Sequence, residues 1–270
     1  MKKYCVYTVL VGDYESLNEQ LVAKQSTVDF ICFTDNRLAR SDTWKIVYAD
    51  PILPLDPART SRLHKICPHR FLADYEASLY IDNRIMLRKL PEVIFADLLK
   101  GSAQLICMAH SFRETVLGEF QEVIRLQLDR LDVILEQLKA YYLTCPDTLA
   151  QKPYNGGFII RRHHHKEVIA AMEIWFAQVL RYSRRDQLSF NYALNRSPMK
   201  ALILDMDIRD SVYSTVTATS RQRTSNPQRS DWPSSKALSP EQETRVKELI
   251  ANLIQLEANG PDHTIPGRQS

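Results

Sequence analysis

Apolar positions in this chain fall into short unbroken runs that alternate with longer segments of helical spacing. The first run, residues 4–11, is rich in β-branched and aromatic side chains and stops at Gly12, a pattern typical of a strand covered on both faces. Runs of similar character follow at residues 28–33, 44–49 and 77–81. Between the last two runs the spacing becomes helical, which predicts a strand–helix–strand unit.

The alternation continues through the second half of the chain. Pro91 occupies a typical first helical position and Gly101 a typical stop, so a helix over residues 91–100 leads into another strand. Between residues 112 and 142 apolar residues recur every three or four positions, which predicts one long amphipathic helix or a broken pair. The remaining predicted elements are strands at 104–109, 156–160 and 202–204 and a helix at 167–182. The whole pattern predicts an α/β fold with a Rossmann-like mixed, mostly parallel sheet flanked by helices.

A change of composition near residue 214 divides the chain. Residues 214–238 are rich in Ser, Thr, Arg, Gln and Pro, which indicates a flexible linker after a domain spanning residues 1–213. Ser239 is a suitable N-cap, and the acidic residues that follow predict an amphipathic helix over 240–256. The third part, residues 239–270, is therefore a C-terminal helix with a disordered end.

Composition narrows the classes of function. The net charge of +3 and pI near 8.5 do not favour nucleic acid as a partner. Five scattered cysteines without CxxC spacing indicate reduced core thiols. No apolar run reaches the ~18 residues of a transmembrane helix, and the N-terminus lacks a signal-peptide pattern, so a cytoplasmic protein is expected. GxGxxG, P-loop and GxSxG motifs are absent, which argues against dehydrogenases, P-loop kinases and serine hydrolases.

Three acids follow predicted strands. Asp13 follows the first strand, Asp35 the second and Asp82 the fourth. In open α/β sheets ligands bind beyond the carboxyl ends of the strands, where such acids can meet a ribose hydroxyl, a metal ion or a sugar. Each acid alone is equally well explained as a turn residue, but the three together favour a ligand site.

A basic stripe lies on the helical segment before Asp82. Arg59, Arg62, Lys65 and His69 are spaced by three, three and four residues, so they are predicted to project from one helix face. Such a face is suited to binding a diphosphate, and the alternative is a solvated face with no ligand.

Two further segments carry candidate chemistry. Asp186 is either a helix cap or a cleft carboxylate that acts as a general base or orients an acceptor. The run His163, His164 and His165 offers a metal ligand only if one imidazole points inward, and a solvated turn is the simpler interpretation.

These residues, taken in order, resemble the TOD/MUCI-type glycosyltransferase-like domain family. The resemblance covers about residues 3–205. The matching residues are Tyr7, Thr8, Gly12, Asp13, Tyr14, residues 32–35, Arg59, Lys65, Pro68, His69, residues 80–82, His110, Arg113, Glu119, residues 161–163 and residues 185–190.

The resemblance implies a fold similar to the A-type glycosyltransferases and transfer of a sugar from a nucleotide-diphosphate sugar. It places Asp82 at the donor sugar or a metal ion and Asp186 near the acceptor, as the catalytic candidates. Donor-binding candidates are Thr8, Asp13, Tyr14, Asp35, Arg59, Arg62, Lys65, His69 and Asn83. Acceptor or supporting candidates are His110, Arg113, Glu119, Arg185 and Gln187.

The segment after Asp82 departs from the A-type pattern. A DxD motif needs a second acid at position 84, but Arg84 stands there and cannot ligate a cation. Either Asp82 binds Mn²⁺ or Mg²⁺ with help from a distant residue, or basic side chains stabilise the leaving diphosphate instead.

The leading hypothesis is therefore a glycosyltransferase that uses a nucleotide-diphosphate sugar and a glycan or other hydroxyl acceptor, in glycan or polysaccharide synthesis. The alternative is a non-catalytic nucleotide-sugar or glycan-binding module with a degenerate metal motif. A hydrolase that pairs Asp82 with Asp186 is a weaker third reading, because their separation does not follow from the sequence.

Overall fold

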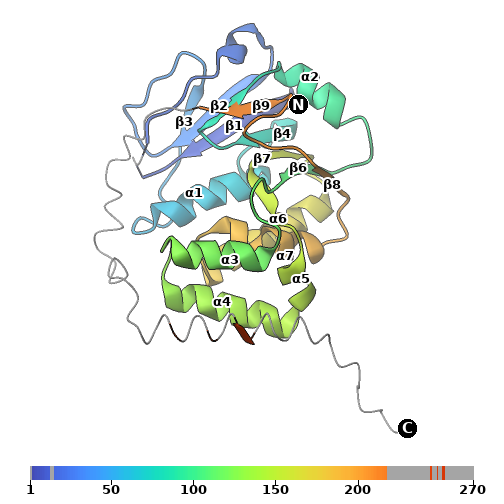
Figure 1. Cartoon of the computed structure of the whole chain (residues 1–270). Helices are drawn as coiled ribbons and strands as arrows, with labels where there is room; N and C mark the ends of the chain where they lie inside the picture. The colour runs from blue at the N-terminus through green and yellow to red at the C-terminus, as the bar shows by residue number, and fades with distance from the viewer. Residues whose placement is uncertain (1, 13–14, 218–243, 245–247, 249–250, 253–270) are drawn as a thin grey trace. The chain divides into compact units, whose positions relative to one another are not determined.

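The central feature of the computed structural model is one seven-stranded sheet in the order β3-β2-β1-β4-β7-β6-β8 (Figure 1). The structure describes residues 2–12, 15–217, 244, 248 and 251–252. Six strands run parallel and β7 runs antiparallel between β4 and β6, which confirms the predicted mixed, mostly parallel sheet. Its strands are β1 (Lys2–Leu10), β2 (Asp29–Thr34), β3 (Lys45–Tyr48), β4 (Tyr75–Ile81), β6 (Leu105–Ala109), β7 (Tyr154–Arg161) and β8 (Ala201–Leu204).

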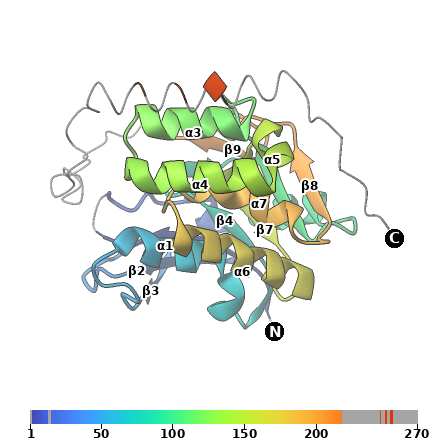
Figure 2. The same cartoon turned by 90° about the horizontal axis from the view of Figure 1, so that it is seen from below.

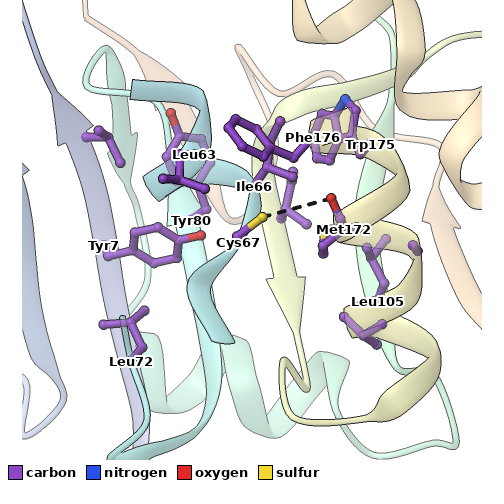
Figure 3. Packing of buried hydrophobic residues seen from close by; sticks show 14 of the residues in the cluster. Tyr7, Leu63, Ile66, Cys67, Leu72, Tyr80, Leu105, Met172, Trp175 and Phe176 are labelled. Carbon is purple, nitrogen blue, oxygen red and sulfur yellow. Dashed lines mark hydrogen bonds between the residues drawn. The ribbon is translucent and has the colours of Figure 1, made fainter. Parts of the chain in front are cut away.

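Helices cover both faces of this sheet. α1 (Pro57–Ile66), α6 (Lys166–Arg181) and α7 (Phe190–Asn195) pack on one face, and α2 (Pro91–Leu98) packs on the other. Because successive strand residues point to opposite faces, Tyr7 joins the first of these cores and Val6 the second. Figure 3 shows Tyr7 and Tyr80 near Leu63 of α1, in the same cluster as Met172 and Trp175 of α6.

A helical insertion separates β6 from β7. It contains α3 (Val116–Arg125), α4 (Leu131–Thr144) and α5 (Pro146–Ala150), and α3 and α4 lie side by side (Figure 2). The helical conformation is interrupted between α3 and α4, where Gln127 adopts a positive φ of 50°. The second of the two predicted arrangements, a broken pair, is therefore the correct one.

The C-terminal boundary lies further along the chain than predicted. Residues after the sheet form β9 (Ser214–Val216), which pairs antiparallel with β5 (Ile85–Leu87), and neither of these short strands was predicted. The first three residues of the predicted linker are therefore a strand that backbone pairing holds against the residues after Asp82. Residues 218–238 of that linker lie outside the described residues. The chain divides into two units, residues 1–227 and residues 228–270.

The predicted C-terminal helix falls mostly outside the described residues. Thr244, Glu248, Ala251 and Asn252 are described, and all four are helical. No helix within the described part of the chain combines the length and apolarity needed to cross a bilayer.

A buried arginine fixes the end of α1. Arg161, on β7, is fully buried and donates hydrogen bonds to the carbonyl oxygens of Lys65 and Ile66 and to the hydroxyl of Tyr7. Carbonyls at a helix C-terminus carry partial negative charge, so they compensate a buried cation that forms no ion pair with any described carboxylate. Arg161 thereby sets the position of the turn that carries Lys65.

His163 is a core residue and not the predicted solvated turn. Its imidazole is fully buried and hydrogen-bonded to Ser78 Oγ at 3.0 Å and Leu72 O at 3.1 Å, whereas His164 and His165 are exposed. Burial, helped by the neighbouring His164, lowers the pKa of His163 to about 4. It therefore stays neutral in the folded protein while the unfolded chain becomes protonated near pH 6.5.

This difference predicts acid sensitivity. Below pH 6.5 the unfolded state binds a proton that folded His163 does not, so the folded state loses stability as pH falls towards 4. Between pH 7.5 and pH 5 the loss from this residue should be on the order of 2 kcal/mol. Urea unfolding at both pH values should show a smaller difference for His163→Gln than for the unaltered protein. His164→Gln is the matched control, and an equal pH dependence in all three proteins would contradict the assignment.

Candidate active site

Asp82 lies at the carboxyl edge of the parallel strands, directly after β4. Its Oδ1 accepts a hydrogen bond from Tyr80 Oη at 2.7 Å and lies 3.5 Å from Lys65 Nζ. The side chain is 51% exposed although the strand before it is buried. Asp82 is therefore an oriented carboxylate that remains open to solvent and to a ligand.

A buried ion cluster lies beside Asp82. Asp186, at the start of η3 (Asp186–Ser189), pairs with Arg62 Nε at 2.8 Å through Oδ1 and with Lys65 Nζ at 2.7 Å through Oδ2. The side chains of Asp186 and Lys65 are only 8% and 5% exposed. Burial acts to raise the pKa of Asp186, but Arg62 and Lys65 outweigh it and hold that pKa well below its usual range.

Two glycines at the start of β7 leave room around these carboxylates. A Cβ on Gly157 would lie 2.9 Å from Asp82 Oδ2 and 3.1 Å from Ile208 Cδ1. A Cβ on Gly156 would lie 3.3 Å from Lys65 Nζ and 3.6 Å from Asp186 Oδ2. A side chain at either position would fill the space that Asp82, Lys65 and Asp186 face.

Gln187 holds this strand start in place. Its Oε1 accepts a hydrogen bond from Gly156 N at 3.3 Å, and its Nε2 donates to Tyr154 O. The backbone carbonyl of Asp186 accepts a bond from the buried indole of Trp175 at 2.8 Å. Gln187 and Trp175 therefore hold the start of β7 and the backbone of Asp186 in position.

Arg185, next to Asp186, and Arg84, two residues after Asp82, differ from Arg62 and Lys65 in their partners. Among the described residues, neither Arg185 nor Arg84 forms an ion pair within 4 Å. The Nε of Arg185 is buried without a hydrogen-bond partner, and its charge lowers the pKa of both Asp186 and Glu119. A buried donor atom without a partner is costly, so this partly buried arginine favours an anionic ligand.

The loop after β6 brings together three predicted residues. Glu119 Oε2 lies 3.5 Å from Arg113 Nε and 3.9 Å from His110 Nε2, and Glu119 is nearly buried. Backbone N–H groups of Phe112 and Arg113 donate to His110 Nδ1 at 3.2 Å. Burial and neighbouring cations lower the pKa of His110 to about 4, so this imidazole is neutral at physiological pH.

The four side chains of the predicted basic stripe do not share one exposed helix face. Arg59 donates to the carbonyls of Val179 and Tyr182 at the end of α6, and it pairs with Asp56. α1 ends at Ile66, so His69 lies on the separate helix η2 (Pro68–Arg70), with Nε2 2.7 Å from Glu173 Oε1. Within the stripe only Arg62 and Lys65 reach the Asp82 region, and Asp186 compensates both.

Three other donor-binding candidates either make structural hydrogen bonds or are closed off from solvent. Thr8 is fully buried in the sheet, so it cannot contact a donor. The amide of Asn83 accepts from Asn18 N at 2.8 Å and donates to Ser16 O at 2.8 Å, which ties down the segment after β1. The carboxylate of Asp35 accepts from Gly12 N at 3.1 Å, joining the ends of β1 and β2. Asp13 and Tyr14 lie outside the described residues.

An open hollow of about 380 Å³ lies beyond Asp35, lined by Asn36, Arg37, Ala39, Arg40, Ser41, Ile46 and Tyr48. None of the predicted site residues lines it. It lies at β2 and β3, whereas the acids and cations above gather around β4 and β7.

The residues around Asp82 do not fit a divalent metal ion. Asp82 is one carboxylate, its Oδ1 is engaged by Tyr80 and Lys65, and Asp186 already compensates two cations. A hard cation needs several oxygen ligands. The one described group of three metal-ligand types with close atoms is Cys67, His69 and Glu173, where Arg70 also pairs with Glu173.

Comparison with known protein families gives one match over most of the chain. Residues 3–220 match the model of the TOD1/MUCI70, glycosyltransferase-like domain. This chain belongs to the TOD1/MUCI70 glycosyltransferase-like family. The match confirms the resemblance seen in the sequence, and it extends through β9.

Comparisons with solved structures and with curated proteins add little to the family assignment. Among solved structures, the apo form of the bifunctional glycosyltransferase WbbM is similar with a TM-score of 0.48 and 8% identity. That similarity covers 75% of this TOD1/MUCI70 family chain and 39% of the WbbM chain, so the chain spans well under half of that protein. No curated protein matches.

Several residues that shape the site were not assigned a role from the sequence. Tyr80 orients Asp82, Gly156 and Gly157 open the space before it, and Arg161 anchors the end of α1. The Gly-Gly pair at a strand start was a usable signal, because glycine inside a strand often marks close approach by another group. Arg161 is among the residues that carry the family resemblance, but its place in a strand gave no sign of its role.

Proposed function

We propose that this protein transfers a sugar from a nucleotide-diphosphate donor to a hydroxyl acceptor in glycan synthesis. The observation that carries the proposal is the exposed carboxylate of Asp82, oriented by Tyr80 and Lys65 opposite Gly157 at the strand-end edge. Membership of a glycosyltransferase-like family supports the same class of reaction. In the proposed complex Asp82 Oδ2 accepts a hydrogen bond from a donor-sugar hydroxyl.

Basic side chains provide the charge that a nucleotide diphosphate needs. In the transfer step the acceptor oxygen bonds to the anomeric carbon and its proton passes to solvent. The bond from that carbon to the diphosphate breaks, and its electron pair and negative charge stay on the leaving diphosphate. Arg185 and Arg84 have charges that no described carboxylate compensates within ion-pair distance, and Lys65 lies next to Asp82. These cations are therefore our candidates for leaving-group stabilisation without a metal ion.

Asp186 has a positioning role in this proposal. A general base needs a pKa near the working pH, but Arg62 and Lys65 hold the pKa of Asp186 far below it. Both carboxylate oxygens are committed to these cations. Asp186 therefore holds Lys65 beside Asp82 and does not take the proton of the acceptor hydroxyl.

Donor binding and turnover test the proposal. A panel of nucleoside diphosphates and nucleotide sugars, added with either EDTA or Mn²⁺, should include one nucleotide that raises the Tm equally under both conditions. Its sugar derivative should release nucleoside diphosphate faster when an acceptor mixture is present. Stabilisation without any release would favour the non-catalytic binding module. A shift that appears only with Mn²⁺ would contradict metal-independent binding, and no shift with any nucleotide would overturn both functions.

A further inference from the structure

An exposed phenylalanine stands beside the candidate active site. Of the nine phenylalanines in the chain, all of which lie in the described part, only Phe112 is exposed, with 56% of its surface accessible. Leaving such a ring in water forgoes the stabilisation that burial would provide. Phe112 follows β6, whose carboxyl end lies at the same edge of the sheet as that of β4.

The ring is held in a defined position. The Arg209 guanidinium lies over the ring, 3.8 Å from its centroid. The backbone N–H of Phe112 donates to His110 Nδ1. Ser111 Oγ donates to Asp207 Oδ1 at 2.6 Å, and Asp207 in turn binds Arg209 through both Oδ atoms at 3.0 Å. The exposed ring is therefore pre-organised by two segments, the loop after β6 and the loop after β8.

One residue links this surface to Asp82. Ile208 lies between Asp207 and Arg209, and its Cδ1 would be 3.1 Å from a Cβ on Gly157. The same Cβ would be 2.9 Å from Asp82 Oδ2. Ile208 and Asp82 thus flank one glycine, and Ile208 belongs to the same segment as Asp207 and Arg209, which hold the Phe112 ring.

We infer that Phe112, Asp207 and Arg209 form a saccharide-binding surface, on which a sugar ring of the acceptor stacks. An aromatic face suits the apolar C–H face of a pyranose, and the adjacent carboxylate and guanidinium accept from and donate to its hydroxyls. This inference rests on the proposed function, and it specifies the acceptor as a glycan rather than a hydroxyl-bearing side chain or small aglycone.

An array of neutral and acidic oligosaccharides, probed with the labelled full chain, tests the inference. The unaltered protein should bind at least one oligosaccharide, and Phe112→Ala should weaken that binding about tenfold. Phe112→Trp should preserve it, because the aromatic face is kept. Leu143→Ala is the matched control, since Leu143 is an exposed apolar residue on α4, and it should bind as the unaltered protein does.

The nucleotide-induced rise in Tm, measured on the same variants, separates this inference from the proposed function. Phe112→Ala should keep the nucleotide response in full. If the nucleotide response is present but no oligosaccharide binds, or if Phe112→Ala binds as tightly as the unaltered protein, the saccharide surface is overturned while the donor site stands. If the nucleotide response is absent, the proposed function fails first.

Discussion

Asp82→Asn should lower sugar-transfer turnover by about 10²–10³-fold while leaving the fold intact. Asparagine keeps the shape of the side chain and can still accept the hydrogen bond from Tyr80, but it removes the negative charge next to Lys65. Because the Asp82 side chain is half exposed, losing its ion pair should change the free energy of unfolding by less than about 1 kcal/mol. Steady-state release of the nucleoside diphosphate, together with a urea unfolding curve, measures both quantities.

Asp50→Asn provides the matched control for this variant. Asp50 is an exposed aspartate that follows the parallel strand β3 at the same edge of the sheet, and it has no place in the proposed site. Its turnover should stay within about twofold of the unaltered protein, as expected for surface substitutions. Near-normal turnover in Asp82→Asn would remove Asp82 from the mechanism.

Asp186→Asn should be strongly destabilising, by about 3 kcal/mol. The substitution removes the buried carboxylate that pairs with both the Lys65 ammonium and the Arg62 guanidinium, and it leaves Lys65 only the longer 3.5 Å contact with the half-exposed Asp82. For a folded unit of this size the loss corresponds to a decrease in Tm of roughly 6–12 °C. Since Lys65 is no longer held beside Asp82, the KM for the donor should also rise. Differential scanning fluorimetry and donor-dependent kinetics measure the two effects.

A second variant separates positioning from acid–base chemistry. The double variant Lys65→Met with Asp186→Asn removes the main buried cation and its partner together, so it should recover part of the stability lost in Asp186→Asn. It should not recover turnover, because Lys65 is absent. If Asp186→Asn instead keeps its stability and donor KM and loses only kcat, Asp186 is a general base and its assigned positioning role is wrong.

The strand-end location of Asp82 was predictable because it depends on local patterns. An unbroken apolar run that stops at a charged residue predicts a strand and its end, and the observed strand β4 does end at Ile81. Parallel strands have their carboxyl ends at one edge, so a ligand site at that edge also followed from the pattern. The helical spacing of Arg62 and Lys65 correctly placed both on α1.

Partners across the fold could not be predicted in the same way. Helical spacing assigned one function to Arg59, Lys65 and His69. Apart from Asp56, which pairs with Arg59 locally, the partners of their side chains lie on α6, on η3 and directly after β4, more than ten positions away in sequence. Similarly, the three adjacent histidines look alike in sequence, and only packing against Leu72 and Ser78 makes His163 a neutral core residue.

For this protein, then, the sequence by itself determined the α/β class, the family and the strand-end position of Asp82, because these follow from apolar periodicity and from motif order. Only the tertiary structure decided which charges are compensated. It paired Asp186 with Arg62 and Lys65, and it left Arg185 without a carboxylate within ion-pair distance among the described residues. The physical reason is that ion pairing falls off over a few ångströms, and contacts at that distance between distant segments exist only once the chain has folded.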